Sequence, residues 1–218
     1  MKYLLLLGLV IALPANAQTP ANPIEVSPFV GYLFGGSFAH IRPDSGWTGV
    51  SIANQVDFGV RVGYRLNAAI EPEIQWTRSE NTKINLESPT EDPWPSFPLT
   101  IDYVLAGASY NFSSGCIRPY ASLDLGVARL ANIRQEDWTH FALTPSTNFA
   151  GSLGLGVKAF ITPQFGIRVE ARGYASQVPQ NFFITCFGQD SGGASFPVSC
   201  GNKWILNSDL TAGIVVAF

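Results

Sequence analysis

A two-residue alternation of apolar and polar side chains runs through most of this chain and strongly narrows the folds open to it. In the segment 55–66, Phe58 and Val60 fall on one face, whereas Asp57 and Arg61 fall on the other. The same alternation recurs in seven further segments, at residues 24–34, 69–79, 100–112, 120–130, 148–161, 165–175 and 207–218. Successive side chains of a strand point to opposite faces of a sheet. The chain is therefore predicted to be all-β, with eight strands.

The connections between these segments alternate in length. The short ones fall at 67–68, 113–118 and 162–164, and the long ones at 35–54, 80–98, 131–147 and 176–206. Strands of roughly 9–11 residues cross a bilayer at a tilt, and bacterial outer-membrane barrels join them by short periplasmic turns and long outer loops. The pattern therefore predicts an eight-stranded antiparallel up-and-down transmembrane β-barrel. The alternation alone leaves open a secreted sandwich or a soluble barrel, in which the apolar face would be buried.

Composition and the first residues agree with an exported membrane barrel. Charged residues make up 13% of the chain, against about 25% in ordinary soluble domains. A basic start at Lys2, an apolar run and a small-x-small site at Ala15 and Ala17 are typical of a secretory signal peptide. We therefore expect a signal peptide at 1–17 and a barrel domain at 18–218.

The last strand carries a distinctive end. Thr211, Gly213, Val216 and Phe218 resemble the C-terminal signal of bacterial outer-membrane barrels, which the assembly machinery reads. Together with the strand pattern, the chain resembles the small eight-stranded outer-membrane barrels of the OmpA/OmpX type over essentially its whole mature length. The resemblance implies the outer membrane of a Gram-negative-type bacterium and contact with the lipid bilayer and lipopolysaccharide. It also implies periplasmic chaperones and the barrel-assembly machinery as partners, and outer loops that can bind an extracellular ligand.

The polar face of the strands carries charges of both signs. An eight-stranded barrel is just wide enough for its side chains to fill, and a buried charge is costly unless it is paired. We therefore expect a plugged, ion-paired interior in which Arg61 and Arg65 meet Glu71 and Glu73 of the neighbouring strand. A narrow gated pore, opened by exchange of these partners, is the alternative. The candidate ion-pair residues are Arg61, Arg65, Glu71, Glu73, Lys158, Arg168, Glu170 and Arg172, with Asp57, Asp124 and Asp209 on the same face.

The cysteines predict one disulfide. Cys186 and Cys200 lie in the longest outer loop of an exported chain, and we expect them to be bonded to each other. Closing a loop of that size contributes about 3 kcal/mol in the chain-entropy model. Cys116 falls in a predicted periplasmic turn and is left as a lone thiol.

Three functions remain open for such a barrel. The first is a structural anchor that displays its loops for adhesion or ligand binding, the second is a narrow pore or small-solute conduit, and the third is a lipid A-modifying enzyme. The chain has two histidines, His40 and His140, both in predicted outer loops, so we expect no enzymatic activity. The net charge of −3 argues against a nucleic-acid partner, and the cysteine and histidine spacing against a metal or cofactor.

Overall fold

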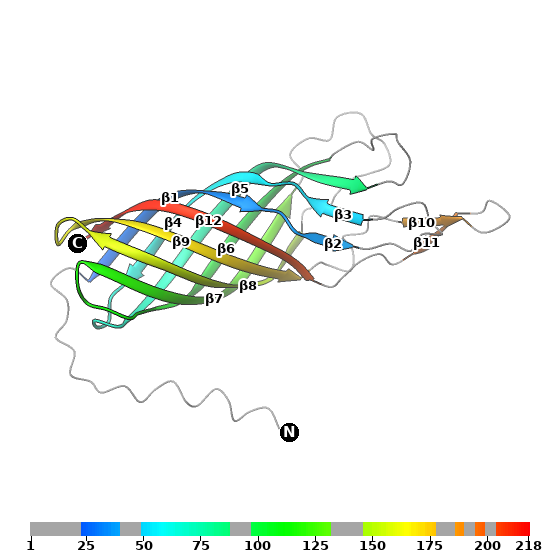
Figure 1. Cartoon of the computed structure of the whole chain (residues 1–218). Coiled ribbons are helices and arrows are strands. Elements are labelled where there is room, and N and C mark those ends of the chain that lie inside the picture. The colour runs from blue at the N-terminus through cyan, green and yellow to red at the C-terminus, as the bar shows by residue number, and fades with distance from the viewer. Residues whose placement is uncertain are drawn as a thin grey trace, which may run out of the picture.

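All regular elements of the described chain are β-strands (Figure 1). The computed structural model describes residues 23–39, 49–87, 97–131, 146–177, 186–189, 195–198 and 204–218. Eight long strands form the wall: β1 (Ile24–Phe34), β4 (Gln55–Tyr64), β5 (Ile70–Glu87), β6 (Phe97–Asn111), β7 (Ile117–Ala131), β8 (Ser146–Phe160), β9 (Phe165–Gln177) and β12 (Trp204–Ala217). Four short strands are β2 (Ser37–Ala39), β3 (Gly49–Ile52), β10 (Cys186–Gln189) and β11 (Ser195–Val198). No helix in the described residues has the length and apolar character to cross a membrane.

The eight long strands close into an antiparallel barrel. Each pairs with its neighbour in the chain, β5 also pairs with β6, and β1 pairs with β12. The closing seam continues to the end of the chain, because the Phe218 backbone N–H donates to the Ile24 carbonyl at 2.9 Å. The predicted eight-stranded antiparallel up-and-down barrel is confirmed.

The turns at one end of the barrel are short and internally hydrogen-bonded. Between β4 and β5, the Asn67 side-chain oxygen accepts from the backbone N–H groups of Ala69 and Ile70 at 2.8 and 2.7 Å. Between β8 and β9, the Thr162 hydroxyl accepts from the Phe165 N–H at 3.0 Å. Short polar side chains thus satisfy the backbone where the ladder ends. The C-terminus lies at this end, which is the periplasmic end of an outer-membrane barrel (Figure 1).

At the other end the wall extends further than the alternation predicts. Residues 80–98 were expected to form a loop, but β5 continues to Glu87 and pairs with β6 from Phe97 onward. Strand β3 adds to the same edge by pairing with β5. A register shift between Ser79 and Thr82 interrupts the ladder, and both of these side chains are buried. This bulge changes the phase of the alternation, which is why the sequence pattern appears to stop at Ser79.

The apolar face of the barrel is the outer one. Leu153, Leu155 and Ile74 are 66%, 67% and 61% exposed, whereas Arg61 and Glu170 on the inner face are each 1% exposed. A soluble barrel or sandwich would show the reverse distribution. An exposed band of leucine, isoleucine and valine is what lipid contact requires.

Two belts of exposed aromatic side chains border this band. The outer belt, toward the long loops, consists of Tyr32, Phe34, Phe58, Phe149 and Trp204. The periplasmic belt consists of Tyr64, Tyr110, Phe112, Phe165 and Phe218. Aromatic rings favour the two membrane–water interfaces, so the belts mark where the bilayer begins and ends.

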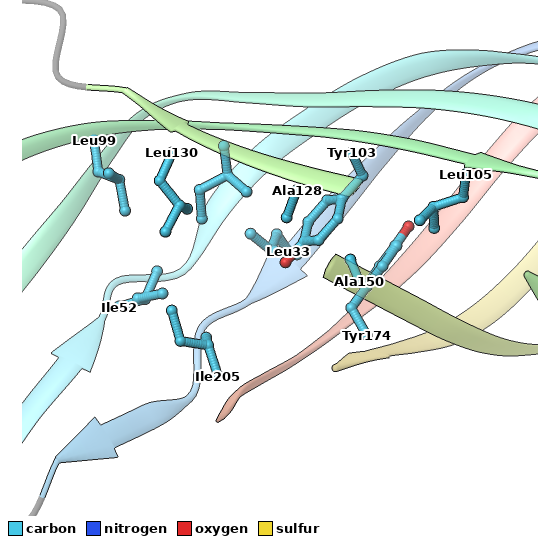
Figure 2. Packing of buried hydrophobic residues seen from close by; sticks show 11 residues of the cluster. Leu33, Ile52, Leu99, Tyr103, Leu105, Ala128, Leu130, Ala150, Tyr174 and Ile205 are labelled. Atoms are coloured by element: carbon cyan, nitrogen blue, oxygen red, sulfur yellow. The ribbon is translucent and has the colours of Figure 1, made fainter. Parts of the chain in front are cut away.

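A cluster of buried apolar side chains lies in the outer half of the lumen (Figure 2). We call this group the apolar plug; it consists of Leu33, Ile52, Leu99, Ile101, Tyr103, Leu105, Ala128, Leu130, Ala150, Tyr174 and Ile205. Its members come from six of the eight wall strands and from β3, and they are at most 3% exposed. The alternation does not predict this layer, because an apolar residue on the inner face does not stand out in a pattern of two classes.

Candidate functional site

The middle of the lumen is occupied by a network of charged side chains around Glu170 on β9. Glu170 forms ion pairs with Arg61 at 2.5 Å, with Arg168 at 3.0 Å and with Arg172 at 2.5 Å. It also accepts a hydrogen bond of 2.5 Å from the Tyr120 hydroxyl. Glu170 therefore lies between three arginines that would otherwise repel one another, and Glu73 and Asp124 supply the two further negative charges that balance them. We call this group, together with Glu73 and Asp124, the central cluster.

Arg172 uses its whole guanidinium in the central cluster. It forms ion pairs with Glu170, with Asp124 and, at 3.3 Å, with Glu73. Its remaining N–H groups donate to the hydroxyls of Ser152 and Ser122 at 2.8 and 3.0 Å. Such complete hydrogen bonding is the condition under which a buried charge is tolerated.

A second group of charges lies toward the periplasmic end, and we call it the periplasmic cluster. The Lys158 ammonium donates to Glu25 at 2.7 Å and to Glu71 at 2.6 Å. Arg65 and Arg118 also approach Glu25, at 3.6 and 3.7 Å. This cluster fills the lumen beneath the central one.

The structure buries all eight predicted ion-pair residues in the lumen, but Arg61 does not form the predicted pair. Arg61 was expected to meet the glutamates of β5, yet the residue opposite it on that strand is Gln75, which accepts from its Nε at 2.6 Å. Its ion pair instead reaches Glu170 on β9, across the lumen. Ion pairs form between the side chains that meet in the centre of the lumen. Which side chains meet there does not follow from which strands are neighbours in the sequence.

Sequence reasoning missed two residues that the clusters need. Glu25 accepts from Lys158 and lies on the inner face of β1, where the phase of the alternation in 24–34 already places it. Tyr120 is 1% exposed, accepts from Arg168 Nε at 2.6 Å and donates to Glu170. A tyrosine on the polar face of a strand gives no charge signal, so only the contacts reveal its part.

Packing against Phe29 explains why the C-terminal motif has a glycine at position 213. A Cβ at Gly213 would lie 2.8 Å from the Cβ of Phe29, and one at Gly59 would lie 2.6 Å from the far end of the same ring. Phe29 therefore occupies the space left by two glycines on neighbouring strands, and Arg61 stacks on its ring at 4.7 Å. Phe218, the terminal residue of the motif, is exposed on the outer wall.

Two carboxylates of the lumen lack donors. Both oxygens of Asp57 and Oδ1 of Asp209 have no hydrogen-bond partner among the described residues. Asp57 lies opposite Gly31 of β1, and Asp209 lies opposite Leu33 of the same strand, so the two carboxylates come from the strands on either side of β1. Only Oδ2 of Asp209 is satisfied, by the Tyr174 hydroxyl at 2.7 Å.

We expect Asp57→Asn to stabilise the barrel by about 1 kcal/mol, since it removes a buried negative charge that has no donor among the described residues. The free energy of unfolding in urea, measured in lipid vesicles, tests this. Asp124→Asn is the matched control: Asp124 is ion-paired with Arg172, and its substitution is expected to destabilise. An equal loss in both variants would show that Asp57 has a native partner.

Some of the residues singled out in the sequence lie outside the part of the chain that the structure describes. Residues 1–17, His40, His140 and Cys200 lie outside the described residues. Of the predicted disulfide, only the backbone of Cys186 is described; it pairs with Val198 in the β10–β11 hairpin. Cys116 is a free, exposed cysteine near the start of β7. The described residues contain no group of three or more histidine, cysteine or acidic side chains arranged to hold a metal ion.

An apolar outer band, two aromatic belts and a charged, filled interior define an integral outer-membrane β-barrel. The chain belongs to the family described as outer membrane protein beta-barrel domain, which matches residues 4–195. The protein therefore resides in the outer membrane of a Gram-negative bacterium.

Solved structures agree with this fold. The barrel is similar to Neisserial surface protein A, with a TM-score of 0.54 and 16% identity over 89% of this chain and 97% of that one. It is also similar to OprG from Pseudomonas aeruginosa, with a TM-score of 0.56 and 11% identity over 92% of this chain and 97% of that one. Comparison with curated proteins finds no significant sequence match. At such identities the likeness concerns the fold.

Proposed function

We propose that this protein is a non-conducting outer-membrane anchor that displays its extracellular segments as a binding surface. The observation that carries the proposal is the filling of the lumen at three levels: the periplasmic cluster, the central cluster and the apolar plug. A water-filled pore needs a continuous open path; ion-paired side chains occupy that path in the two charged clusters, and mainly apolar side chains occupy it in the plug. Neither pore conduction nor enzymatic activity forms part of the proposal.

The apolar plug is the stronger of the barriers to ions. The rings of Tyr103 and Tyr174 stack with centroids 4.4 Å apart and planes at 21°, and both residues are 2% exposed. An ion entering this layer would lose its hydration among mainly apolar side chains, since the hydroxyls of Tyr103 and Tyr174 are already hydrogen-bonded to Asn207 and Asp209. Exchange of ion-pair partners in the central cluster alone would therefore not open a path.

The extracellular side offers an ordered base for display. Strands β5 and β6 continue their ladder past the bulge at Ser79, and β3 and then β2 add to this edge. The β10–β11 hairpin is a separate two-stranded sheet on the same side (Figure 1). Backbone pairing holds such segments in a defined arrangement, which lowers the entropy that a binding surface loses when it meets a ligand. We further propose that a Cys186–Cys200 disulfide closes the segment around this hairpin.

We expect the refolded wild-type barrel to give no discrete current steps in a planar bilayer at potentials up to 100 mV in either direction. Folding of the same sample is verified by its shifted migration on an unheated gel. A porin added afterwards to the same bilayer shows that channels are detectable. Reproducible steps from the folded protein would overturn the proposal and favour the narrow pore.

A further inference from the structure

A groove of about 400 Å³ lies on the outer wall of the barrel, over β7, β8, β9 and β12. Its floor is made of small residues, Gly151, Gly173 and Ala175. Its sides are the leucines Leu123, Leu125, Leu153 and Leu206, each more than half exposed. The groove belongs to the lipid-facing surface, and none of the clusters in the lumen explains it.

Strand register shows why the wall is hollow here. Leu125, Gly151, Ala175 and Leu206 face one another in succession across four strands, so two small residues lie between two large ones. A Cβ built at Gly173, in the next row, would have no heavy atom within 4 Å. Because the surroundings are hydrocarbon and the walls are apolar, a lipid chain fills such a space better than water.

Polar residues lie directly above the groove, toward the long loops. On the outer face of β7 and β8, the pair Val127–Phe149 follows the row of Gly151, and the pair Arg129–Thr147 follows that. Phe149 belongs to the outer aromatic belt, so Arg129 lies at the level of the lipid headgroups. Leu125 and Arg129 are four residue steps apart along β7, which is about 13 Å.

Arg129 is available to an external anion. It is exposed, and it forms no ion pair with another described residue. The acidic residue opposite it on β6, Asp102, is already engaged by Arg78 at 3.6 Å. A guanidinium at the interface favours phosphate oxygens, with which it forms charge-assisted hydrogen bonds.

We propose that this groove and Arg129 form a binding site for one lipopolysaccharide molecule of the outer leaflet. One acyl chain lies over Gly151 and Gly173 between the leucines, and a lipid A phosphate contacts Arg129. The groove lies in the outer half of the wall, so its ligand comes from the outer leaflet. The positive charge of Arg129 above the groove favours a phosphorylated lipid. The inference does not depend on whether the barrel conducts or displays a ligand-binding surface.

The test is native mass spectrometry of the refolded full-length mature barrel in mild detergent, titrated with deep-rough lipopolysaccharide. Wild type is expected to retain one lipopolysaccharide molecule at low lipid excess. Gly173→Leu places a side chain in the groove, its Cβ meets no heavy atom within 4 Å, and the substitution is expected to abolish this retention. Arg129→Gln is expected to weaken it about tenfold, as loss of one charge-assisted hydrogen bond implies. Ala108→Leu, on the exposed outer face of β6, is the matched control and is expected to bind as wild type does.

Several outcomes would overturn the proposal. Equal retention by wild type and Gly173→Leu would show that the groove is not the site. Equal retention of phosphatidylglycerol and lipopolysaccharide by wild type would show a general lipid contact without selectivity. A dimer peak in wild type that disappears in Gly173→Leu would assign the groove to a second copy of the chain. Gel migration of unheated samples establishes that each variant is folded.

Discussion

Arg172→Met is expected to unfold at a much lower urea concentration than the wild-type barrel, with a loss of about 3–5 kcal/mol in the free energy of unfolding. Methionine retains much of the side-chain volume. It removes the positive charge that forms ion pairs with Glu170, Glu73 and Asp124. Three carboxylates would then compete for fewer donors in a space that excludes bulk water. Tryptophan fluorescence during urea unfolding in lipid vesicles measures the effect.

Arg78→Met is the matched control for that experiment. Arg78 also forms two ion pairs, with Glu80 at 2.7 Å and Asp102 at 3.6 Å, but its side chain is 34% exposed on the outer surface. Exposed pairs contribute about 0–1 kcal/mol, so the expected change is small. Losses of similar size in the two variants would mean that water reaches the central cluster and screens its charges.

Tyr174→Ala is the second large effect we expect, with a loss of about 3–5 kcal/mol through the cavity that it leaves. Tyr174 joins the two halves of the lumen: its ring stacks on Tyr103 in the apolar plug, while its hydroxyl donates to Asp209 and accepts from Gln75 at 3.1 Å. Its removal takes away both the packing of the plug and the polar contact beneath it.

Tyr174→Phe separates these two contributions. The ring and its stacking on Tyr103 remain, and only the hydroxyl is lost, so the expected cost is about 1–3 kcal/mol. Urea unfolding of both variants in the same vesicles gives the comparison. If Tyr174→Ala cost no more than Tyr174→Phe, the plug would be loosely packed, and its proposed part in closing the lumen would be wrong.

Much of the fold follows from local sequence alone. Alternation of side chains is a property of a single extended strand, so Arg61 and Val60 are assigned to opposite faces without knowledge of any partner strand. The same logic places Glu25 inside, although the predicted ion-pair residues did not include it. The turns at Asn67 and Thr162 are likewise local, because their side chains bond to backbone only two or three residues ahead.

Interruptions of the pattern limited what the sequence could predict about the strands. The bulge between Ser79 and Thr82 changes the phase of the alternation, and beyond it β5 no longer shows the contrast of a strand in lipid. The continuation of β5 and β6 above the membrane therefore became visible only through their pairing with each other and with β3. The apolar plug was missed for a related reason: Leu33 and Ile101 face inward, and an apolar residue on a polar face does not stand out in a two-class pattern.

The sequence by itself determined the strands, their faces and the identity of the charges that would be buried, because these depend on neighbours along one chain. Only the tertiary structure decided which charges meet. Closure of the sheet brings β4 and β9 to face each other across the lumen, so Arg61 pairs with Glu170 and not with a glutamate of the adjacent strand. The groove at Gly173 has the same origin, since it arises from the register of four strands and from no single one of them. Contacts between residues of different strands depend on the curvature of the wall and on the register of the strands. The alternation within one strand carries no information about either.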